Sequence, residues 1–248
     1  MTPDRLTLDG SWVNAAPALP LGHLDLRLTE LSVVVLELLA PEDTLKLLRA
    51  EAAEQRLPRA VPKRQAEFAA GRHAARFALA AIDVRGPVVR GEDAAPRWPS
   101  GAVGSISHGA GIAVAAVART STHRGVGIDV ERVVTRDTHA ELIARVAAPQ
   151  ELVVLTRALP EVSNELLFSL IFSAKESLFK CLFPLAQVFF GFEDAVLQAA
   201  RLTGPQHATL RFELLRALSS EFPANTTLEA RCYFEATRVV SAVTLEQR

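Results

Sequence analysis

The sequence predicts an α+β fold, in which helices and antiparallel strands occupy separate stretches of the chain. Residues 63–81 and 164–182 repeat apolar side chains at helical spacing. From residue 195 onward, apolar and polar side chains alternate, which is typical of strands. Residues 109–111, with two glycines, separate two further strand-like runs and indicate a hairpin. Strands joined by short turns are antiparallel, so the pattern favours α+β.

The remaining elements follow in order along the chain. The first forty residues alternate apolar and polar side chains around several prolines, which suggests strands and loops. A helix is expected at residues 41–53, because Pro41 and two acids occupy its first turn. Further strands are expected at residues 105–108, 112–118, 125–131, 208–214, 227–235 and 239–245, and a further helix at 139–146.

Residues 120–124 form a polar linker near the middle of the chain. A chain of 248 residues can form one large domain or two small ones. The linker is the best candidate boundary, and it divides the sequence into residues 1–122 and 123–248.

The composition is that of an ordinary globular protein, with 49% hydrophobic and 22% charged residues. The net charge of −1 gives no general attraction to nucleic acid or acidic membranes. The polar start does not resemble a signal peptide, and the apolar run 31–40 contains Glu37 and is too short to span a bilayer. Two cysteines give no disulfide framework, and Cys181 is expected to be a core thiol. We expect a cytoplasmic monomer without nucleic-acid or membrane partners.

An acidic strand is the first candidate for chemistry. In the segment 127–131, Asp129 and Glu131 share one face of the strand with Gly127. Two neighbouring carboxylates repel each other unless a positive charge lies between them. Mg²⁺ commonly binds one or two carboxylates together with phosphate oxygens. The alternative is a solvated acidic face, although Gly127 would leave room for a ligand.

A buried helix supplies a third carboxylate. Glu176 lies on an apolar helix between Lys175 and Lys180. An uncompensated carboxylate in such surroundings is costly, by several kcal/mol. The alternative is a salt bridge between Glu176 and Lys180 at i,i+4 spacing. Together, the acidic strand and this helix indicate metal-assisted phosphoryl chemistry.

Basic residues in the first half could bind a phosphate. Arg64 and Arg72 fall in an apolar stripe of one helix, and a guanidinium group can donate two hydrogen bonds to a phosphate. The alternative is that their stems cover the edge of a core. Arg90 precedes a Gly/Pro loop, where its side chain either contacts a ligand or is a surface charge. His108 ends a strand, where it either has a structural role or donates a hydrogen bond to a phosphate.

Five motifs in this order resemble the surfactin-type 4′-phosphopantetheinyl transferases, most closely the branch related to enterobactin synthesis. Each motif alone is modest evidence, but the five follow one another at family-like separations. They span roughly residues 58 to 196, more than half of the chain. The matching segments are 61–72, 95–108, 127–131, 172–180 and 190–195.

The resemblance implies a specific reaction. Such enzymes transfer the phosphopantetheine arm of coenzyme A to a serine of an acyl, aryl or peptidyl carrier protein. They release adenosine 3′,5′-bisphosphate and need Mg²⁺, although the oxygen ligands would also suit Mn²⁺. The implied fold is a pseudo-dimer of two similar α+β halves with the active site at their interface. The branch points to secondary metabolism, with siderophore, polyketide and nonribosomal-peptide carriers all possible.

The resemblance also implies roles for individual residues. Asp129, Glu131 and Glu176 match the metal-binding acids, and Glu176 also matches the proposed general base. Lys180 matches a lysine that aids the leaving phosphate, and Lys175 one that contacts the pyrophosphate. The positions that match the coenzyme A grip, chiefly on its 3′-phosphate and adenylate end, are Arg64, Arg72, Arg90, Ser107 and His108.

One departure from the family pattern is Phe179, where close relatives often have Tyr. It removes a hydroxyl group that could contact the pantetheine arm. Two other functions use the same residues: an Mg²⁺-dependent hydrolase of coenzyme A or a nucleotide, and a non-catalytic module that binds coenzyme A or a carrier protein. The base Glu176 and the lysine Lys180 argue against the non-catalytic module, because binding alone needs neither.

Overall fold

The computed structural model describes residues 4–6, 12–14, 30–49, 60–135 and 142–247. The chain divides into two compact units. Unit 1 comprises Met1–Arg124 together with Glu246–Arg248, and unit 2 comprises Gly125–Leu245. Among the described residues, no helix is long and apolar enough to cross a membrane.

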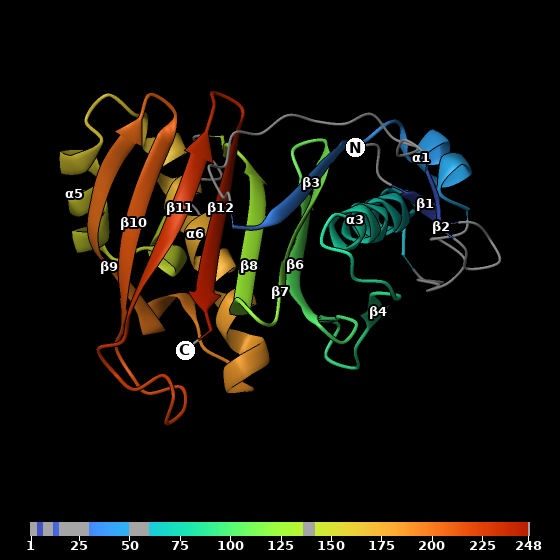
Figure 1. Ribbon diagram of the computed structural model, residues 1–248. Coiled ribbons are helices and arrows are strands. Elements are labelled where there is room, and N and C mark those ends of the chain that lie inside the picture. Colours follow the sequence, from blue (N-terminus) through green and yellow to red (C-terminus); the bar gives the residue numbers. More distant parts are fainter. Residues whose placement is uncertain (1–3, 7–11, 15–29, 50–59, 136–141, 248) are drawn as a thin grey trace. The chain divides into compact units, whose positions relative to one another are not determined.

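Unit 1 is built on a three-stranded antiparallel sheet (Figure 1). Its strands are ordered β3 (Ser32–Glu37), β7 (Ile112–Arg119) and β6 (Ala102–Gly109). The predicted hairpin between residues 105 and 118 is confirmed as β6 and β7. Its turn places Ala110 at φ 48° and Gly111 at φ 81°, the left-handed region that glycine adopts readily.

Helix α3 (Pro62–Ala80) covers one face of this sheet. It begins at a proline and carries a row of alanines that are fully buried against the strands. A Cβ added at Gly71 would lie 2.7 Å from Cγ2 of Ile106, so the small side chain permits close packing. Because strand side chains alternate, Ile106 and His108 face this helix and Ser107 faces the other way.

The smaller elements of unit 1 are short. The predicted helix at 41–53 is observed as α1 (Pro41–Leu47), and residues 50–53 lie outside the described residues. The strands expected in the first forty residues include β3 and a separate two-stranded pair. The remaining short strands are β1 (Asp4–Leu6), β2 (Trp12–Asn14), β4 (Val89–Arg90) and β5 (Pro96–Arg97).

Unit 2 contains a five-stranded sheet in the order β8-β12-β11-β10-β9 (Figure 1). The four C-terminal strands pair antiparallel, as their apolar–polar alternation predicts. The five strands of the sheet are β8 (His123–Arg132), β9 (Ala195–Gly204), β10 (His207–Leu214), β11 (Thr227–Phe234) and β12 (Arg238–Glu246).

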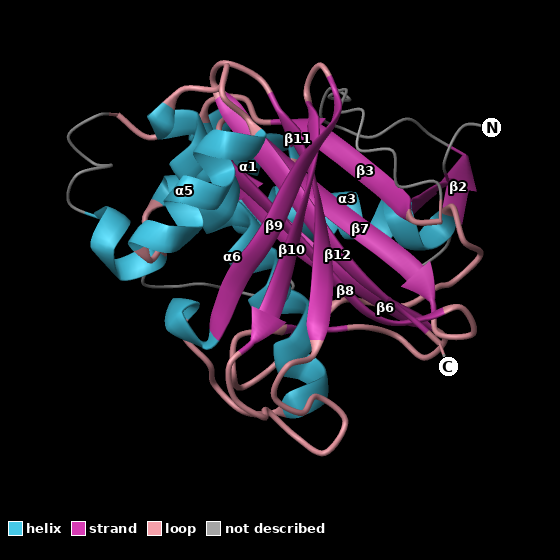
Figure 2. Ribbon diagram, turned by 90° about the vertical axis from the view of Figure 1, so that its left-hand side faces the viewer, coloured by secondary structure: helices cyan, strands magenta, loops and turns pink. Residues whose placement is uncertain are grey.

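Two helices pack on one side of this sheet, as Figure 2 shows for α5 (Pro149–Ala158) and α6 (Asn164–Ala186). The core of the unit is formed between them and the strands. The predicted helix 164–182 is confirmed and extends further, whereas α5 was not predicted. Residues 142–146 are also helical, and the rest of that predicted helix lies outside the described residues.

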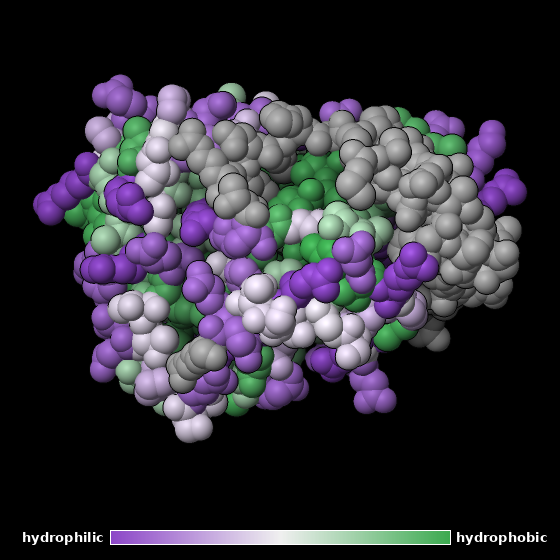
Figure 3. All heavy atoms as spheres, in the orientation of Figure 1, coloured by the Kyte–Doolittle hydropathy of each residue, from purple (hydrophilic) through white to green (hydrophobic). Residues whose placement is uncertain are grey.

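The outer face of the sheet of unit 2 is polar. Along β11, Leu228, Ala230 and Cys232 are buried, and the residues between them are exposed. Hydrophilic side chains accordingly spread over the visible side of this unit in Figure 3. Segregated helices and antiparallel strands in each unit confirm the α+β class.

The two units share one feature of strand order. In unit 1, the first sheet strand, β3, lies beside the last, β7. In unit 2, the first strand, β8, lies beside the last, β12. Helices follow the first strand in both units, and an antiparallel strand series then returns to it.

Candidate active site

The acidic face of β8 packs directly against α6. A Cβ added at Gly127 would overlap the carbonyl oxygen of Ser177 and would lie 2.7 Å from the backbone nitrogen of Cys181. Gly127 is therefore needed because a helix backbone approaches it closely. The expectation that this glycine leaves room for a ligand is wrong, since α6 fills that space.

Asp129 and Lys180 form an ion pair between this strand and the helix. Lys180 Nζ lies 2.6 Å from Asp129 Oδ1. The Asp129 side chain is 3% exposed and that of Lys180 is 28% exposed. The ion pair thus joins the helix to the strand. Burial raises the pKa of Glu176, and the positive charge of Lys180 partly offsets that rise.

The three predicted metal-binding carboxylates influence one another electrostatically. Burial, together with repulsion from Asp129, raises the pKa of Glu131 to about 7. Burial is also the main cause of the raised pKa of Glu176, and Asp129 adds to it. A carboxylate with a raised pKa is a better proton acceptor near neutral pH. Added positive charge at this place would relieve the repulsion.

Oxygen donors of this kind suit Mg²⁺, which often binds one or two carboxylates and takes its other ligands from water and phosphate. Within the described ranges, however, no three acidic, histidine or cysteine side chains are grouped closely enough to hold a metal ion by themselves. Asp129, Glu131 and Glu176 are therefore not a complete metal site in the described structure, and their role in holding a metal ion stays a prediction.

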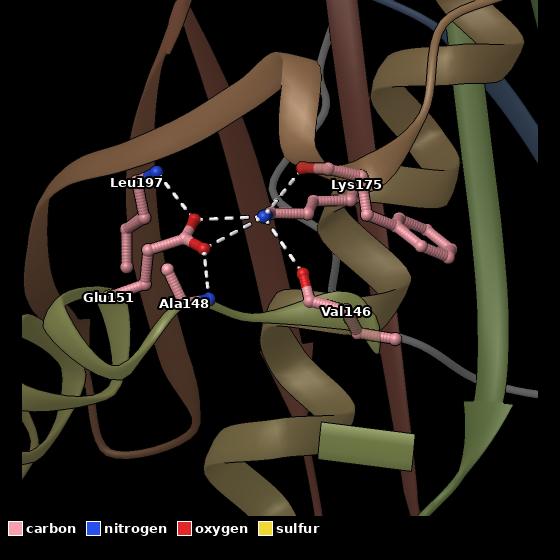
Figure 4. A network of polar contacts seen from close by, with 6 residues as sticks. Val146, Ala148, Glu151, Lys175 and Leu197 are labelled. Atoms are coloured by element: carbon pink, nitrogen blue, oxygen red, sulfur yellow. Dashed lines mark hydrogen bonds and ion pairs between the residues drawn. The ribbon is translucent and has the colours of Figure 1, made fainter. Parts of the chain in front are cut away.

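Lys175 lies in a buried polar network (Figure 4). Its ammonium group donates to the backbone oxygens of Val146 and Phe192, both at 2.9 Å. Its third partner is the carboxylate of Glu151, with Oε1 at 2.9 Å. Burial lowers the pKa of Lys175, and Glu151 opposes that effect. Three acceptors match the three N–H bonds of an ammonium group, so the predicted pyrophosphate contact is not part of this arrangement.

Glu151, the acidic partner in this network, was not predicted from the sequence. Besides Lys175, it accepts hydrogen bonds from the backbone N–H groups of Ala148 and Leu197, at 2.8 and 2.7 Å. It thereby joins the start of α5 to β9. The signal was a Pro-Gln-Glu run at residues 149–151, in which an acid at the third helical position can cap the helix start.

A pocket of about 760 Å³ in unit 2 contains Glu176 in its wall. Most of the lining is apolar, and Lys175, Arg145 and Glu193 supply the other polar side chains. The ring of Phe179 lies 5.3 to 5.5 Å from those of Phe189 and Phe190, so it packs within the wall. The aromatic residues of the lining are Phe172, Phe179, Phe189, Phe190 and Phe192.

A second pocket, of about 310 Å³, lies in unit 1. It gathers four of the five residues predicted to hold coenzyme A, namely Arg64, Arg72, Arg90 and His108. Burial and the nearby charge of Arg90 lower the pKa of Arg72 to about 10, which leaves it charged at neutral pH. The guanidinium of Arg72 also lies 4.5 Å from the centre of the Phe68 ring. A bound anion would relieve the repulsion between these cations.

His108 lines the pocket of unit 1 and also contacts Glu67, an acid that was not predicted. Its Nε2 lies 2.7 Å from Arg64 Nη1, and its Nδ1 lies 3.5 Å from the carboxylate of Glu67. Glu67 favours a proton on Nδ1, which lets Nε2 accept from Arg64. Ser107, by contrast, is buried on the opposite face of β6.

The chain was compared with known protein families. The model for the 4′-phosphopantetheinyl transferase N-terminal domain matches residues 52–118. The model for the 4′-phosphopantetheinyl transferase superfamily matches residues 125–227. The 4′-phosphopantetheinyl transferase PptT of Mycobacterium tuberculosis is 33% identical over 192 residues, which cover 76% of this chain and 82% of that protein. The chain belongs to the 4′-phosphopantetheinyl transferase family of enzymes.

Other members of the family are also similar. The 4′-phosphopantetheinyl transferase Svp of Streptomyces mobaraensis is 40% identical over 162 residues, or 64% of this chain and 63% of that protein. The match therefore spans slightly less than two thirds of the Streptomyces enzyme. Enterobactin synthase component D of Salmonella typhi is 36% identical over 148 residues, 60% of each chain.

The two family models coincide with the two chemically distinct pockets. The N-terminal domain model covers α3 and β6, which supply Arg64, Arg72 and His108. The superfamily model covers β8 and α6, which supply Asp129 and Glu176. Membership of the 4′-phosphopantetheinyl transferases thus rests on both the basic and the acidic parts of the chain.

Proposed function

We propose that this protein transfers 4′-phosphopantetheine from coenzyme A to a serine of an acyl, aryl or peptidyl carrier protein in an Mg²⁺-dependent reaction. The observation that carries the proposal is Glu176, whose pKa is raised in the wall of an apolar pocket. The neighbouring Lys180–Asp129 pair supplies a cation beside it. Family membership defines which group is transferred.

The basic pocket of unit 1 is proposed to bind the 3′-phosphate and adenylate end of coenzyme A. Arg64, Arg72, Arg90 and His108 line it. Guanidinium groups bind phosphate oxygens through paired hydrogen bonds, and the mutual repulsion of Arg72 and Arg90 favours a doubly charged anion between them. Ser107 is included in this proposal only because it matches a coenzyme A-binding position of the family.

Glu176 is proposed to act as the general base. The serine oxygen forms a bond to the phosphorus that carries pantetheine, while the bond from that phosphorus to the leaving oxygen of adenosine 3′,5′-bisphosphate breaks. Glu176 takes the proton of the serine hydroxyl, directly or through a water molecule. Lys180, next to Asp129, offsets the negative charge that grows on the leaving phosphate.

Asp129, Glu131 and Glu176 are the residues that would hold Mg²⁺, and Mn²⁺ suits the same oxygen ligands. Bound there, the ion supplies positive charge to the pyrophosphate. Burial chiefly raises the pKa of Glu131, and the repulsion from Asp129 that adds to this rise supports a cation at this place. We expect chelation of divalent ions to abolish transfer, and added Mg²⁺ to restore it.

Lys175 is proposed to position the catalytic helix, in place of the pyrophosphate contact that the family pattern implied. All three acceptors of its ammonium group belong to the protein: Val146, Glu151 and Phe192. Two of these, Val146 and Phe192, also line the pocket that contains Glu176. The network therefore fixes Lys175, the residue before Glu176, relative to the pocket wall.

The two units are proposed to be similar halves of a pseudo-dimer that share one active site, divided near residues 122–123. In both units the first strand lies beside the last, and helices follow the first strand. The distribution of charged residues supports the proposal, because the basic pocket is in unit 1 and the acids are in unit 2.

We further propose that the enzyme works as a cytoplasmic monomer and serves carriers of siderophore, polyketide or nonribosomal-peptide synthesis.

Mass spectrometry of a panel of apo-carrier proteins, incubated with coenzyme A and Mg²⁺, tests the function. The expected result is the mass of one phosphopantetheine group on the conserved serine of at least one carrier. Consumption of coenzyme A without any acceptor would instead indicate a hydrolase. Binding of coenzyme A without turnover on any carrier of the panel would indicate a non-catalytic module.

A further inference from the structure

The loop that follows α6 forms one wall of the pocket containing Glu176. Phe189, Phe190 and Gly191 of this loop line the pocket, as does Phe192 in the short 3₁₀ helix η1 (Phe192–Asp194). At the beginning of the loop, Gln187 adopts φ 54° and ends α6. The position of the loop therefore decides the shape of the pocket.

Phe189 is the most exposed aromatic residue of this wall. It is 73% exposed, whereas the neighbouring Phe190 is 4% exposed. The centre of its ring lies 5.5 Å from that of Phe179 in a T-shaped arrangement. A single aromatic contact of this kind stabilises a position by about 1 kcal/mol. A further interaction is needed to fix the loop.

Arg216 supplies that interaction from a different part of the sequence. Its Nη2 donates to the backbone oxygen of Phe189 at 2.8 Å. The same guanidinium group holds the carboxylate of Asp194, with Nε at 2.8 Å from Oδ1 and Nη2 at 3.0 Å from Oδ2. Asp194 in turn accepts from the backbone N–H of Gly191 at 2.9 Å. One arginine thus connects both ends of the loop.

The backbone reinforces this connection. The N–H of Leu215, the residue before Arg216, donates to the backbone oxygen of Asp194 at 2.9 Å. The segment after β10 and the segment before β9 are therefore tied together beside the pocket. The planar guanidinium group donates to both carboxylate oxygens of Asp194, through Nε and Nη2, and also to the carbonyl oxygen of Phe189 through Nη2. A lysine ammonium at this place would not reproduce the paired contact with the carboxylate.

We propose that Arg216 and Asp194 form a clamp that positions Phe189 in the pocket wall and so determines how well the pocket receives the pantetheine arm of coenzyme A. The inference rests on the proposed transferase function. Arg216 and Asp194 are positioning residues, because they act through Phe189 and are not part of the pocket lining. Loss of the clamp should weaken substrate binding more than the chemical step, since Glu176 and Lys180 lie on α6 and stay in place.

The kinetic test uses full-length variants in a double-mutant cycle. We expect Arg216→Ala to raise the KM for coenzyme A by about two- to fivefold, with kcat and the KM for the carrier protein nearly unchanged. In the Phe189→Ala background, Arg216→Ala should have no further effect, because the group that it positions is gone. Additive effects of the two substitutions, or a rise confined to the KM for the carrier protein, would overturn the proposal.

A second measurement separates the clamp from the catalytic proposal. Hydrogen exchange of a peptide covering residues 187–194 should become faster in Arg216→Ala and in Asp194→Asn. The matched control is Arg238→Ala, which removes an ion pair to Glu235 elsewhere in unit 2 and should leave that peptide unchanged. Faster exchange in a protein that transfers nothing would reject the transferase function but keep the clamp. Unchanged exchange in an active enzyme would reject the clamp alone.

Discussion

The ammonium group of Lys175 and the carboxylate of Glu151 form an ion pair 2.9 Å apart, with both side chains only 2% exposed. Backbone hydrogen bonds to Glu151 from Ala148 and Leu197 complete the network. A buried ion pair is strongly sensitive to the loss of one partner, because the remaining charge has no compensation. Lys175 is adjacent to Glu176 in the chain, so the network connects stability with the candidate active site.

Lys175→Ala should therefore destabilise the protein. We expect the free energy of unfolding to fall by about 3–5 kcal/mol, measured by urea denaturation. The double variant Lys175→Met/Glu151→Gln should recover part of the loss, because neither charge is then left alone. A Lys175→Ala variant of unchanged stability but weakened coenzyme A binding would show that Lys175 contacts the pyrophosphate after all.

Glu176→Gln should remove catalysis without harming the fold. We expect the rate of carrier modification to fall by about 10²- to 10⁴-fold, because the base is lost. Stability should be unchanged or higher, since burial and Asp129 already disfavour the charge, as the raised pKa of Glu176 indicates. Initial rates by mass spectrometry and a denaturation curve check both parts. Full activity in this variant would reject the proposed base.

Arg72→Ala should discriminate between coenzyme A and dephospho-coenzyme A. If Arg72 holds the 3′-phosphate, affinity for coenzyme A should fall about 10- to 100-fold, as expected for a hydrogen bond to a charged group. Affinity for dephospho-coenzyme A should change little. Calorimetric titration of both ligands measures this, with Lys63→Ala on the same helix as the control, because that side chain is 77% exposed. Equal losses for both ligands would assign Arg72 a structural role.

Gly127→Ala should disrupt the packing of α6 against β8. The added Cβ would overlap the backbone of Ser177, which cannot turn aside as a side chain can. We expect a loss of about 3 kcal/mol in the free energy of unfolding. Gly111→Ala is the matched control, since its Cβ would meet nothing within 4 Å and only its positive φ should cost about 1 kcal/mol. Similar losses for both variants in urea denaturation would contradict this explanation.

Cys232 should be unreactive in the folded protein. Burial raises the pKa of its thiol from an ordinary 9.0 to about 12, so almost no thiolate exists at pH 8. Its contribution to stability is complete below pH 9 and declines as pH rises towards 12, because the unfolded chain loses the proton first. Cys181 is also buried, as predicted. Labelling with a chromogenic disulfide should be slow before denaturation and reach both thiols afterwards; rapid labelling of native Cys232 would contradict its burial.

Local patterns in the sequence were sufficient for the type of most elements. The helical repeat before Lys180 predicted α6, and the apolar run 112–118, which follows the glycine-containing turn 109–111, predicted β7. Helix α5 was missed, although Pro149 and Glu151 in its first turn are typical of a helix start. The predicted residues Arg64 and Arg72 do line one pocket, because they are separated by about two turns of a single helix.

The sequence alone determined most of the element types, the acidic face of β8 and the family motifs, because each depends on residues close together in the chain. Only the tertiary structure decided which distant groups meet. Glu151 pairs with Lys175 from 24 residues away, and Arg216 reaches Asp194 from 22 residues away. The tertiary structure also showed that Gly127 allows α6 to pack closely against β8. Such pairings depend on packing across helices and strands, and neither residue spacing nor side-chain periodicity encodes that geometry.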